Sequence, residues 1–161
     1  MEKQPNSRMC FVCGIENPIG LYLSFYTDDE GRTVARFPVP GQHRTGRPKS
    51  EHQGYPGAMH GGIVTALLDE VIARVAIAQD LLWGVTAKLE VRFRHPVPLG
   101  QPLTLVGELT RLRSRTLEAH GEIRLEDGTV AAEAEGVYIR LPQEEIERME
   151  EELGFWKVVP D

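Results

Sequence analysis

The chain has 161 residues and a mass of 18.0 kDa, a size that suits one domain with its own hydrophobic core. It carries 24 acidic and 18 basic residues, a formal charge of −6, and 41% of its residues are hydrophobic, which excludes a disordered chain and a general nucleic-acid binder. Two cysteines, a polar first segment and the lack of a long uncharged apolar run predict a cytoplasmic protein with no disulfide framework and no membrane span.

Residues 1–20 are polar and rich in turn-forming side chains, and we expect an N-terminal arm. Within it, Cys10 and Cys13 stand at the spacing of a metal-binding or redox pair. A structural zinc site needs four ligands, and the other candidates, such as His43 and His52, are scattered along the chain. No strand is predicted before the pair and no helix after it, so a thioredoxin-like motif is poorly supported. We therefore expect a folded turn here, with no metal and no cofactor.

Two short strands are predicted at 21–26 and 33–39, with a hairpin turn at 28–31 between them. Residues 40–59 contain three prolines and four glycines and are expected to form a long loop. A loop of this length in a small domain is often functional.

A helix is predicted to start at His60, because apolar residues recur at helical spacing as far as Ala78 and cover almost all of its faces. Glu70 and Arg74 stand four residues apart and are expected to form its one wet stripe. Asp69 lies about 100° around the helix from Glu70, on a small and apolar face. Burial of an unpaired carboxylate is costly, so Asp69 is either a site residue or a solvated helix acid.

The segment before this helix is rich in glycine and ends in Met59, His60, Gly61 and Gly62. Its glycines let the backbone approach a ligand, and the N–H groups of the first helical turn stabilise negative charge on an oxygen. The alternative is a tight turn without a ligand. Two helical turns separate His60 from Asp69, so both features can belong to one site only if two subunits meet across a two-fold axis.

Four strand-like runs follow at 86–94, 103–113, 116–125 and 129–141, and their short connections predict an antiparallel meander. The expected fold class is α+β, with an antiparallel sheet wrapped around one long helix at 21–141. One sheet covers only part of so apolar a helix, so we expect a homodimer or a dimer of dimers.

Basic residues cluster on these strands at Arg92, Arg94, Arg111, Arg113 and Arg115. Since alternate residues of a strand share a face, members of this cluster can line one side of the sheet. They are either solvated strand ends or a surface for an anionic ligand such as a phosphorylated carrier.

The charge of the chain is concentrated in the region 142–161, predicted to be an acidic C-terminal helix or tail. Residues 143–161 hold seven acids and two bases, a net −5, whereas the first 142 residues hold 17 acids and 16 bases, a net −1. Ile146, Met149 and Leu153 form one apolar stripe along the tail. A nearly neutral domain with a local basic cluster is compatible with a polyphosphorylated ligand.

The run His60-Gly61-Gly62, followed by Asp69 nine residues after the histidine and then by Gly84-Val85-Thr86, has a specific order and spacing. It resembles the signature of the hotdog-fold acyl-coenzyme A thioesterases of the phenylacetate-pathway (PaaI-like) type. The opening segment from Cys10 to Gly14 is also similar to that of many bacterial relatives. The likeness extends over roughly residues 10–141.

The resemblance implies hydrolysis of acyl-coenzyme A at sites between the subunits of a dimer. It implies that the backbone N–H of Gly61, next to His60, polarises the thioester carbonyl, and that the partner subunit's Asp69 acts as general base or nucleophile. Thr86 matches a hydroxyl residue that helps to hold the water. The remaining candidates for substrate contact are Met59 and Gly62 beside the helix start, and Arg94, Arg113 and Arg115 as partners of the coenzyme A phosphates.

The sequence departs from the family at one position. Many relatives place an asparagine six residues before the histidine to fix the water, and here that position is Gly54. Gln53 or His52 is the available substitute. A site that holds no water could still bind its ligand, so the alternative function is a non-catalytic module that binds or senses acyl-coenzyme A.

Overall fold

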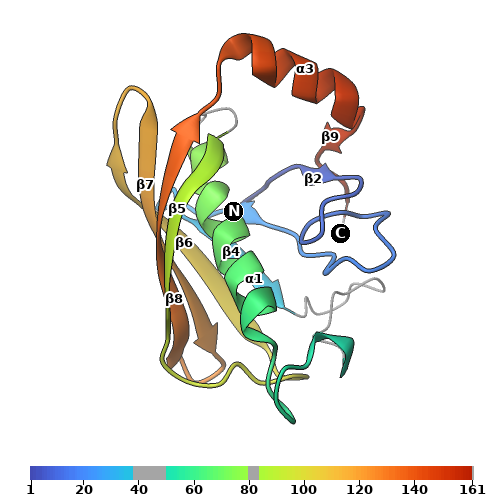
Figure 1. Ribbon diagram of the computed structural model, residues 1–161, viewed down its shortest axis with the longest axis vertical. Helices are drawn as coiled ribbons and strands as arrows, with labels where there is room; N and C mark the ends of the chain where they lie inside the picture. Colours follow the sequence, from blue (N-terminus) through green and yellow to red (C-terminus); the bar gives the residue numbers. More distant parts are fainter. Residues whose placement is uncertain (38–49, 80–83, 161) are drawn as a thin grey trace.

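In the part of the chain that the structure describes, residues 1–37, 50–79 and 84–160, a seven-stranded antiparallel sheet curves around helix α1 (Gly61–Ala73) (Figure 1). This computed structural model confirms the predicted fold class, a sheet wrapped around a long central helix as in the hotdog fold. Across the same residues, no helix combines the length and the apolar character that crossing a membrane requires.

The order of strands in the sheet corrects one prediction. The four long strands do not form a single meander, because β5 pairs with β8 at one edge of the sheet and not with β6. The connection from β5 to β6 contains Pro96, Pro98 and Pro102 and has no tight hairpin turn. It passes the positions of β8 and β7, because β6 lies between β4 and β7 in the sheet. From edge to edge the strands are β1 (Glu2–Lys3), β3 (Tyr26–Thr27), β4 (Thr33–Phe37), β6 (Leu103–Leu112), β7 (Thr116–Leu125), β8 (Val130–Arg140) and β5 (Gly84–Phe93).

The predicted strand at 21–26 is mostly buried, but Tyr22 has a positive φ of 54°, and only Tyr26 joins the sheet, as part of β3. Its backbone bonds to the N-terminal segment instead, since the N–H of Leu21 donates to the Phe11 carbonyl and that of Leu23 to the Val12 carbonyl, at 2.8 and 2.9 Å. The following turn at 28–31 forms as predicted, with Asp28 accepting from the N–H of Arg32. Residues 38–49, including His43 and half of the predicted loop, lie outside the described residues.

The N-terminal arm is packed into the protein, with buried side chains at Gln4, Asn6 and Cys13. Strand β2 (Asn6–Ser7) pairs with β9 (Trp156–Lys157), so the two ends of the chain lie side by side (Figure 1). Between β8 and β9, helix α3 (Gln143–Leu153) carries the acidic tail, and its Ile146 is 1% exposed. A short 3₁₀ helix η1 (Ser50–His52) precedes α1.

Helix α1 lies very close to the sheet because three neighbouring strands present glycine beneath it. A Cβ at Gly107 would lie 2.5 Å from the Val71 carbonyl oxygen, and one at Gly121 would lie 2.5 Å from Ile72 Cγ1. Gly136 on β8 completes this glycine strip. After Ala73 the helix breaks at Arg74 and continues as the short α2 (Val75–Ala78), so the predicted helix is confirmed in two pieces.

His120 on β7 gives the fold a titratable contact. Its ring nitrogens lie 2.8 Å from Glu135 Oε1 and 3.2 Å from Glu122 Oε1. Partial burial alone would lower the pKa of His120, but the hydrogen bonds to these two carboxylates raise it. The protonated ring therefore stabilises the folded state fully below the unfolded pKa of about 6.5, and this contribution is lost as pH rises through the raised folded pKa.

Replacing His120 with glutamine should remove this pH dependence. We expect the wild-type chain to lose more stability than His120→Gln between about pH 6 and about pH 8, because only the wild type loses an ionic contact there. Urea unfolding at both pH values measures the difference. Equal pH dependence in the two proteins would contradict the assignment.

Candidate functional site

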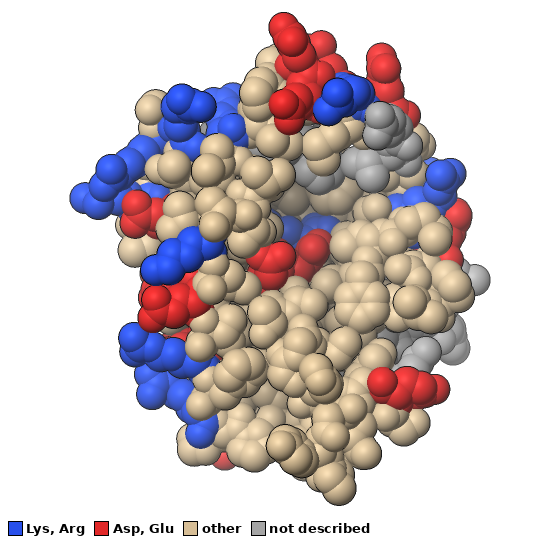
Figure 2. Space-filling view, in the orientation of Figure 1, with Lys and Arg blue, Asp and Glu red and all other residues tan. Residues whose placement is uncertain are grey.

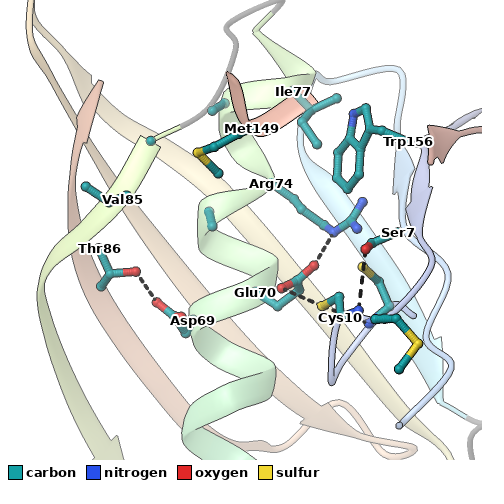
Figure 3. Close-up of a pocket in the computed structure, with 15 residues that line it drawn as sticks. Ser7, Cys10, Asp69, Glu70, Arg74, Ile77, Val85, Thr86, Met149 and Trp156 are labelled. Carbon is teal, nitrogen blue, oxygen red and sulfur yellow. Dashed lines mark hydrogen bonds and ion pairs between the residues drawn. The ribbon is translucent and has the colours of Figure 1, made fainter. Parts of the chain in front are cut away.

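The Asp69 carboxylate on α1 is held by two hydroxyl groups from the sheet. Thr86 Oγ1 on β5 donates to Asp69 Oδ1 at 2.8 Å (Figure 3). The Tyr138 hydroxyl on β8 donates to the same oxygen at 2.8 Å. Among the described residues no side chain or backbone group donates to Oδ2. One carboxylate oxygen is thus fixed and the other is oriented and available, so the sequence-based view of Asp69 as a lone carboxylate was wrong.

Tyr138 is the site residue that sequence reasoning missed. Burial, followed by the charge of Asp69, raises the pKa of Tyr138, so the phenol stays protonated and donates its hydrogen bond. A Cβ at Gly136 would lie 2.6 Å from the Tyr138 ring, so this glycine makes room for it. Thr86 and Tyr138 face each other across the β5–β8 pair, a neighbour relation that the expected meander excluded.

A cavity of about 620 Å³ opens beside this carboxylate, within the range typical of sites for small organic ligands. Figure 2 shows it as a hollow in the middle of this face of the molecule. Asp69 and Thr86 lie on one side of α1 in the cavity, and Glu70, Arg74 and Cys10 on the other (Figure 3). Its apolar walls come from α1 and α2, the start of β5, and the chain ends, with Ala73, Ala76, Ile77, Val85, Met149 and Trp156.

The Glu70–Arg74 ion pair forms as predicted, but it is not the solvent-exposed face of the helix that the sequence suggested. Arg74 Nε donates to Glu70 Oε1 at 2.8 Å, and the Arg74 side chain is only 3% exposed. The guanidinium lies 4.4 Å from the Phe25 ring centroid and 5.3 Å from that of Trp156, and it also donates to the Pro5 carbonyl. The N-terminal arm and β9 bury the ion pair. The sequence pattern of the helix alone does not predict this burial.

The helix start leaves one backbone donor available. His60 caps α1, with its Nδ1 accepting from the N–H of Gly62 at 2.9 Å, and its carbonyl accepts from Ile63 and Val64. Among the described residues nothing accepts from the N–H of Gly61. Gly61 is therefore the first-turn group that can bind an anionic oxygen, whereas the N–H of Gly62 is already used.

The structure keeps the two predicted halves of the site apart. Gly61 and Asp69 are eight residues apart on one helix, which is about 12 Å along its axis. Within one chain they cannot act on the same carbonyl group. The sequence predicted that His60–Gly61 and Asp69 lie about two helical turns apart, and the structure confirms this distance along α1.

The other residues near the helix start have structural partners. Met59 is 5% exposed, belongs to the hydrophobic core and does not line the cavity. A Cβ at Gly54 would lie 3.0 Å from His60 Cα, so no larger side chain fits there without a shift. Of the two suggested substitutes, Gln53 accepts from the N–H of Gly57 at 3.3 Å, and His52 is buried.

The basic residues divide into two groups. Arg113 and Arg115 line a second cavity of about 200 Å³ together with Arg140 and Tyr138. This cavity shares Ala73, Ala76 and Gly84 with the larger one. Arg94 lies at the far end of β5, forms an ion pair with Glu133 and lines neither cavity. Figure 2 shows basic side chains along the flank of the sheet and acidic ones over α3.

Comparisons with known proteins relate this chain to thioesterases. Residues 56–132 match the sequence profile of the thioesterase superfamily. Acyl-coenzyme A thioesterase THEM4 of Bos taurus is 30% identical over 145 residues, which are 89% of this chain and 56% of that protein. The chain spans about half the length of the curated relatives it matches.

Solved structures share the fold. A thioesterase superfamily protein, 30% identical, superposes with a TM-score of 0.72 over 82% of this chain and 63% of its own. A hypothetical thioesterase protein of Streptococcus pneumoniae, whose crystal structure contains coenzyme A, is 21% identical with a TM-score of 0.63, over 75% of this chain and 87% of its own.

Proposed function

We propose that this chain is an acyl-coenzyme A thioesterase, which hydrolyses acyl-coenzyme A thioesters to a free acid and coenzyme A; the match of residues 56–132 to the thioesterase superfamily and the likeness to THEM4 support the proposal. The observation that carries the proposal is the Asp69 carboxylate, fixed through Oδ1 and available through Oδ2 at the wall of an apolar cavity. Thioester hydrolysis needs a base or nucleophile, a water and a donor for the carbonyl oxygen. This chain offers Asp69 for the first role and the Gly61 N–H for the last. The proposed location is cytoplasmic, because a chain with only two cysteines has no disulfide framework of the kind found in secreted proteins.

Asp69 can act in two ways that its geometry supports equally. As a general base, Oδ2 removes a proton from a water that attacks the thioester carbon. As a nucleophile, Oδ2 attacks that carbon, expels the coenzyme A thiolate and forms a mixed anhydride that water then hydrolyses. Thr86 and Tyr138 keep the carboxylate in one orientation in both routes. Single-turnover hydrolysis in ¹⁸O water separates them, because attack of water on the aspartyl carbonyl of the anhydride leaves the label in Asp69.

The carbonyl oxygen of the substrate requires the Gly61 N–H of a second subunit. The free edge of β5 supports such a dimer, since this ten-residue strand pairs within the described chain only with β8. Val85 is 46% exposed and Phe93 57%, and both lie on β5. A long edge strand with exposed apolar residues favours pairing with another chain, and a two-fold axis there would bring two helix starts toward two Asp69 carboxylates.

The two cavities suggest how the substrate lies. The apolar walls of the larger cavity suit an acyl group, with Met149 and Trp156 of the C-terminal segment at its end (Figure 3). Arg113, Arg115 and Arg140 concentrate positive charge around the smaller cavity, which suits phosphate groups. We assign the acyl group to the first and the coenzyme A phosphates to the second. Arg94 is assigned no role in the same chain's site because Glu133 already pairs with it.

Replacing Asp69 with asparagine should lower kcat for acyl-coenzyme A hydrolysis by about 10²–10⁴-fold, because the amide neither accepts the proton nor attacks the carbonyl. Release of free thiol from a series of acyl-coenzyme A esters measures the rate. Asp29→Asn, on an exposed turn, is the matched control and should keep wild-type turnover. Near wild-type rates in Asp69→Asn, or a wild-type chain that binds these esters without cleaving them, would overturn the proposal in favour of a binding module.

Replacing Gly61 with proline should remove the oxyanion donor while keeping the helix, since proline is favoured at the first helical position and lacks an N–H. We expect kcat to fall about 10²-fold or more, and Gly61→Ala, which keeps the N–H, to stay within about tenfold of wild type. A Cβ at position 61 meets only the Phe93 ring at 3.6 Å, an ordinary contact.

Mixing the two inactive variants tests whether subunits share the site. A heterodimer of Gly61→Pro and Asp69→Asn contains one site with both changes and one with neither, so co-refolding the two should restore activity. Failure of a mixture with proven subunit exchange to regain any activity would contradict a shared site.

Replacing Arg113 and Arg115 together with alanine should raise KM for acyl-coenzyme A by about tenfold or more, because two partners of the phosphates are lost. Short thioesters without the nucleotide should be cleaved as before. The control, Arg36→Ala with Arg124→Ala, removes the same charge from positions that line neither cavity. An equal rise in KM for both kinds of substrate, or for the control pair, would refute the assignment.

A further inference from the structure

The turn that contains Cys10 and Cys13 holds two thiols next to the buried ion pair. The N–H of Gly14 donates to the Cys10 carbonyl at 2.9 Å, which confirms the predicted turn. A Cβ on Gly14 would lie 2.2 Å from that carbonyl oxygen, so only glycine closes the turn here. The two sulfur atoms and a Glu70 carboxylate oxygen lie within 4.8 Å of one another, and both cysteines are reduced. Residues three apart in one turn can form a disulfide by rotation of their side chains.

The two thiols differ in exposure and in partners. Cys10 is partly exposed on the cavity wall, and its thiol donates to Glu70 Oε2 at 3.8 Å (Figure 3). Its sulfur also accepts backbone N–H bonds from Val12 and Cys13 at 3.3 and 3.4 Å. Cys13 is 1% exposed. A hydrogen bond from the Cys13 thiol lowers the pKa of Cys10 to about 7, and the same bond with burial raises the pKa of Cys13. A partly exposed thiol next to a buried second thiol is an arrangement that can exchange with disulfides, and the lowered pKa of Cys10 favours it as the attacking group.

The buried Arg74 guanidinium adds a second, independent observation. Its Nη2 atom has no hydrogen-bond partner in the part of the chain that the structure describes, although the side chain is almost fully enclosed. The Cys13 sulfur is among the groups that interact with Arg74. A buried donor without an oxygen acceptor favours a neighbour that can become anionic, and the Cys13 sulfur meets that condition.

We propose that Cys10 and Cys13 form a thiol–disulfide exchange site that reacts with the disulfide of a small thiol. Cys10 faces a cavity of about 620 Å³ and not a flat surface, so the cavity admits a small molecule more readily than the disulfide of another protein. The exchange site shares this cavity with the proposed acyl group but uses other residues, because the two cysteines lie on the other side of α1 from Asp69 and Thr86 (Figure 3).

The reaction balances without any further reagent. The Cys10 thiolate attacks one sulfur of the small disulfide, whose S–S bond breaks, and the other half leaves as a thiolate that takes up a proton. Cys13 then loses its proton and attacks the Cys10 sulfur of the mixed disulfide, releasing the second small thiol. Two electrons pass from the cysteine pair to the small disulfide, so the protein gains one disulfide and two small thiols are released.

Oxidised glutathione is the probe for this exchange. The reduced full chain is incubated at a series of ratios of oxidised to reduced glutathione. An alkylating reagent then stops the exchange, and the mass of the intact chain is measured by mass spectrometry. We expect the wild type to lose two hydrogen atoms and both alkylatable thiols, with no lasting adduct. In Cys13→Ser, the glutathione adduct should persist on Cys10. Cys10→Ser should react at least about tenfold more slowly, since its remaining thiol is buried.

Several outcomes would overturn the proposal. They are a wild-type chain that keeps both thiols under oxidising conditions, equal reactivity of the two serine variants, and faster reaction with a disulfide-bonded protein than with glutathione. Zinc chloride, added in competition with a chromogenic chelator, tests the metal alternative, and tight binding that prevents oxidation would assign the cluster to a metal. Peptide mapping of wild-type alkylation, with Cys10 labelled before Cys13, keeps the test valid if a variant fails to fold. None of these readouts uses acyl-coenzyme A, so hydrolysis and exchange can fail independently.

Discussion

The closeness of α1 to the sheet is the constraint on which the rest of the structure depends. The glycine strip of Gly107, Gly121 and Gly136 removes the side chains that would otherwise hold the helix away. At this short distance a hydroxyl on β5 and a phenol on β8 both reach one carboxylate oxygen of Asp69. A helix seated farther out would leave the carboxylate in solvent, without the two donors that orient it.

The buried Glu70–Arg74 pair organises the other side of the helix. Burial of a guanidinium is unfavourable unless its charge is paired, and here Glu70 pairs with it while the Pro5 carbonyl and two aromatic rings contact it. Its Nη2 atom alone has no hydrogen-bond partner among the described residues. Both chain ends take part, because Pro5 belongs to the arm and Trp156 to β9. This part of the cavity wall therefore consists of segments that pack against the buried charge.

Much of the fold and of the candidate site could be predicted from the sequence. The helix, the long strands and the glycine-rich helix start have strong local patterns, and the nine-residue spacing from His60 to Asp69 placed the two halves of the site on one helix. What failed depends on contacts between distant segments. The β5–β8 pairing, and with it the role of Tyr138, has no local signal, because each strand fits a meander equally well. The burial of Arg74 depends on residues about 70 positions earlier and 80 later, which no helical pattern encodes.

The pairing of β2 with β9 makes the first and last parts of the chain mutually dependent. During synthesis the sheet and α1 can assemble before β9 is made. The part of the cavity wall that contains Trp156 forms only after β9 has been synthesised and has paired with β2. In the folded protein β2 and β9 have two residues each, so few backbone hydrogen bonds join them. This pair of strands can therefore separate while the central sheet stays folded. The order of assembly thus separates a durable core, which holds Asp69, from a late-forming cover, which determines how far the cavity is enclosed.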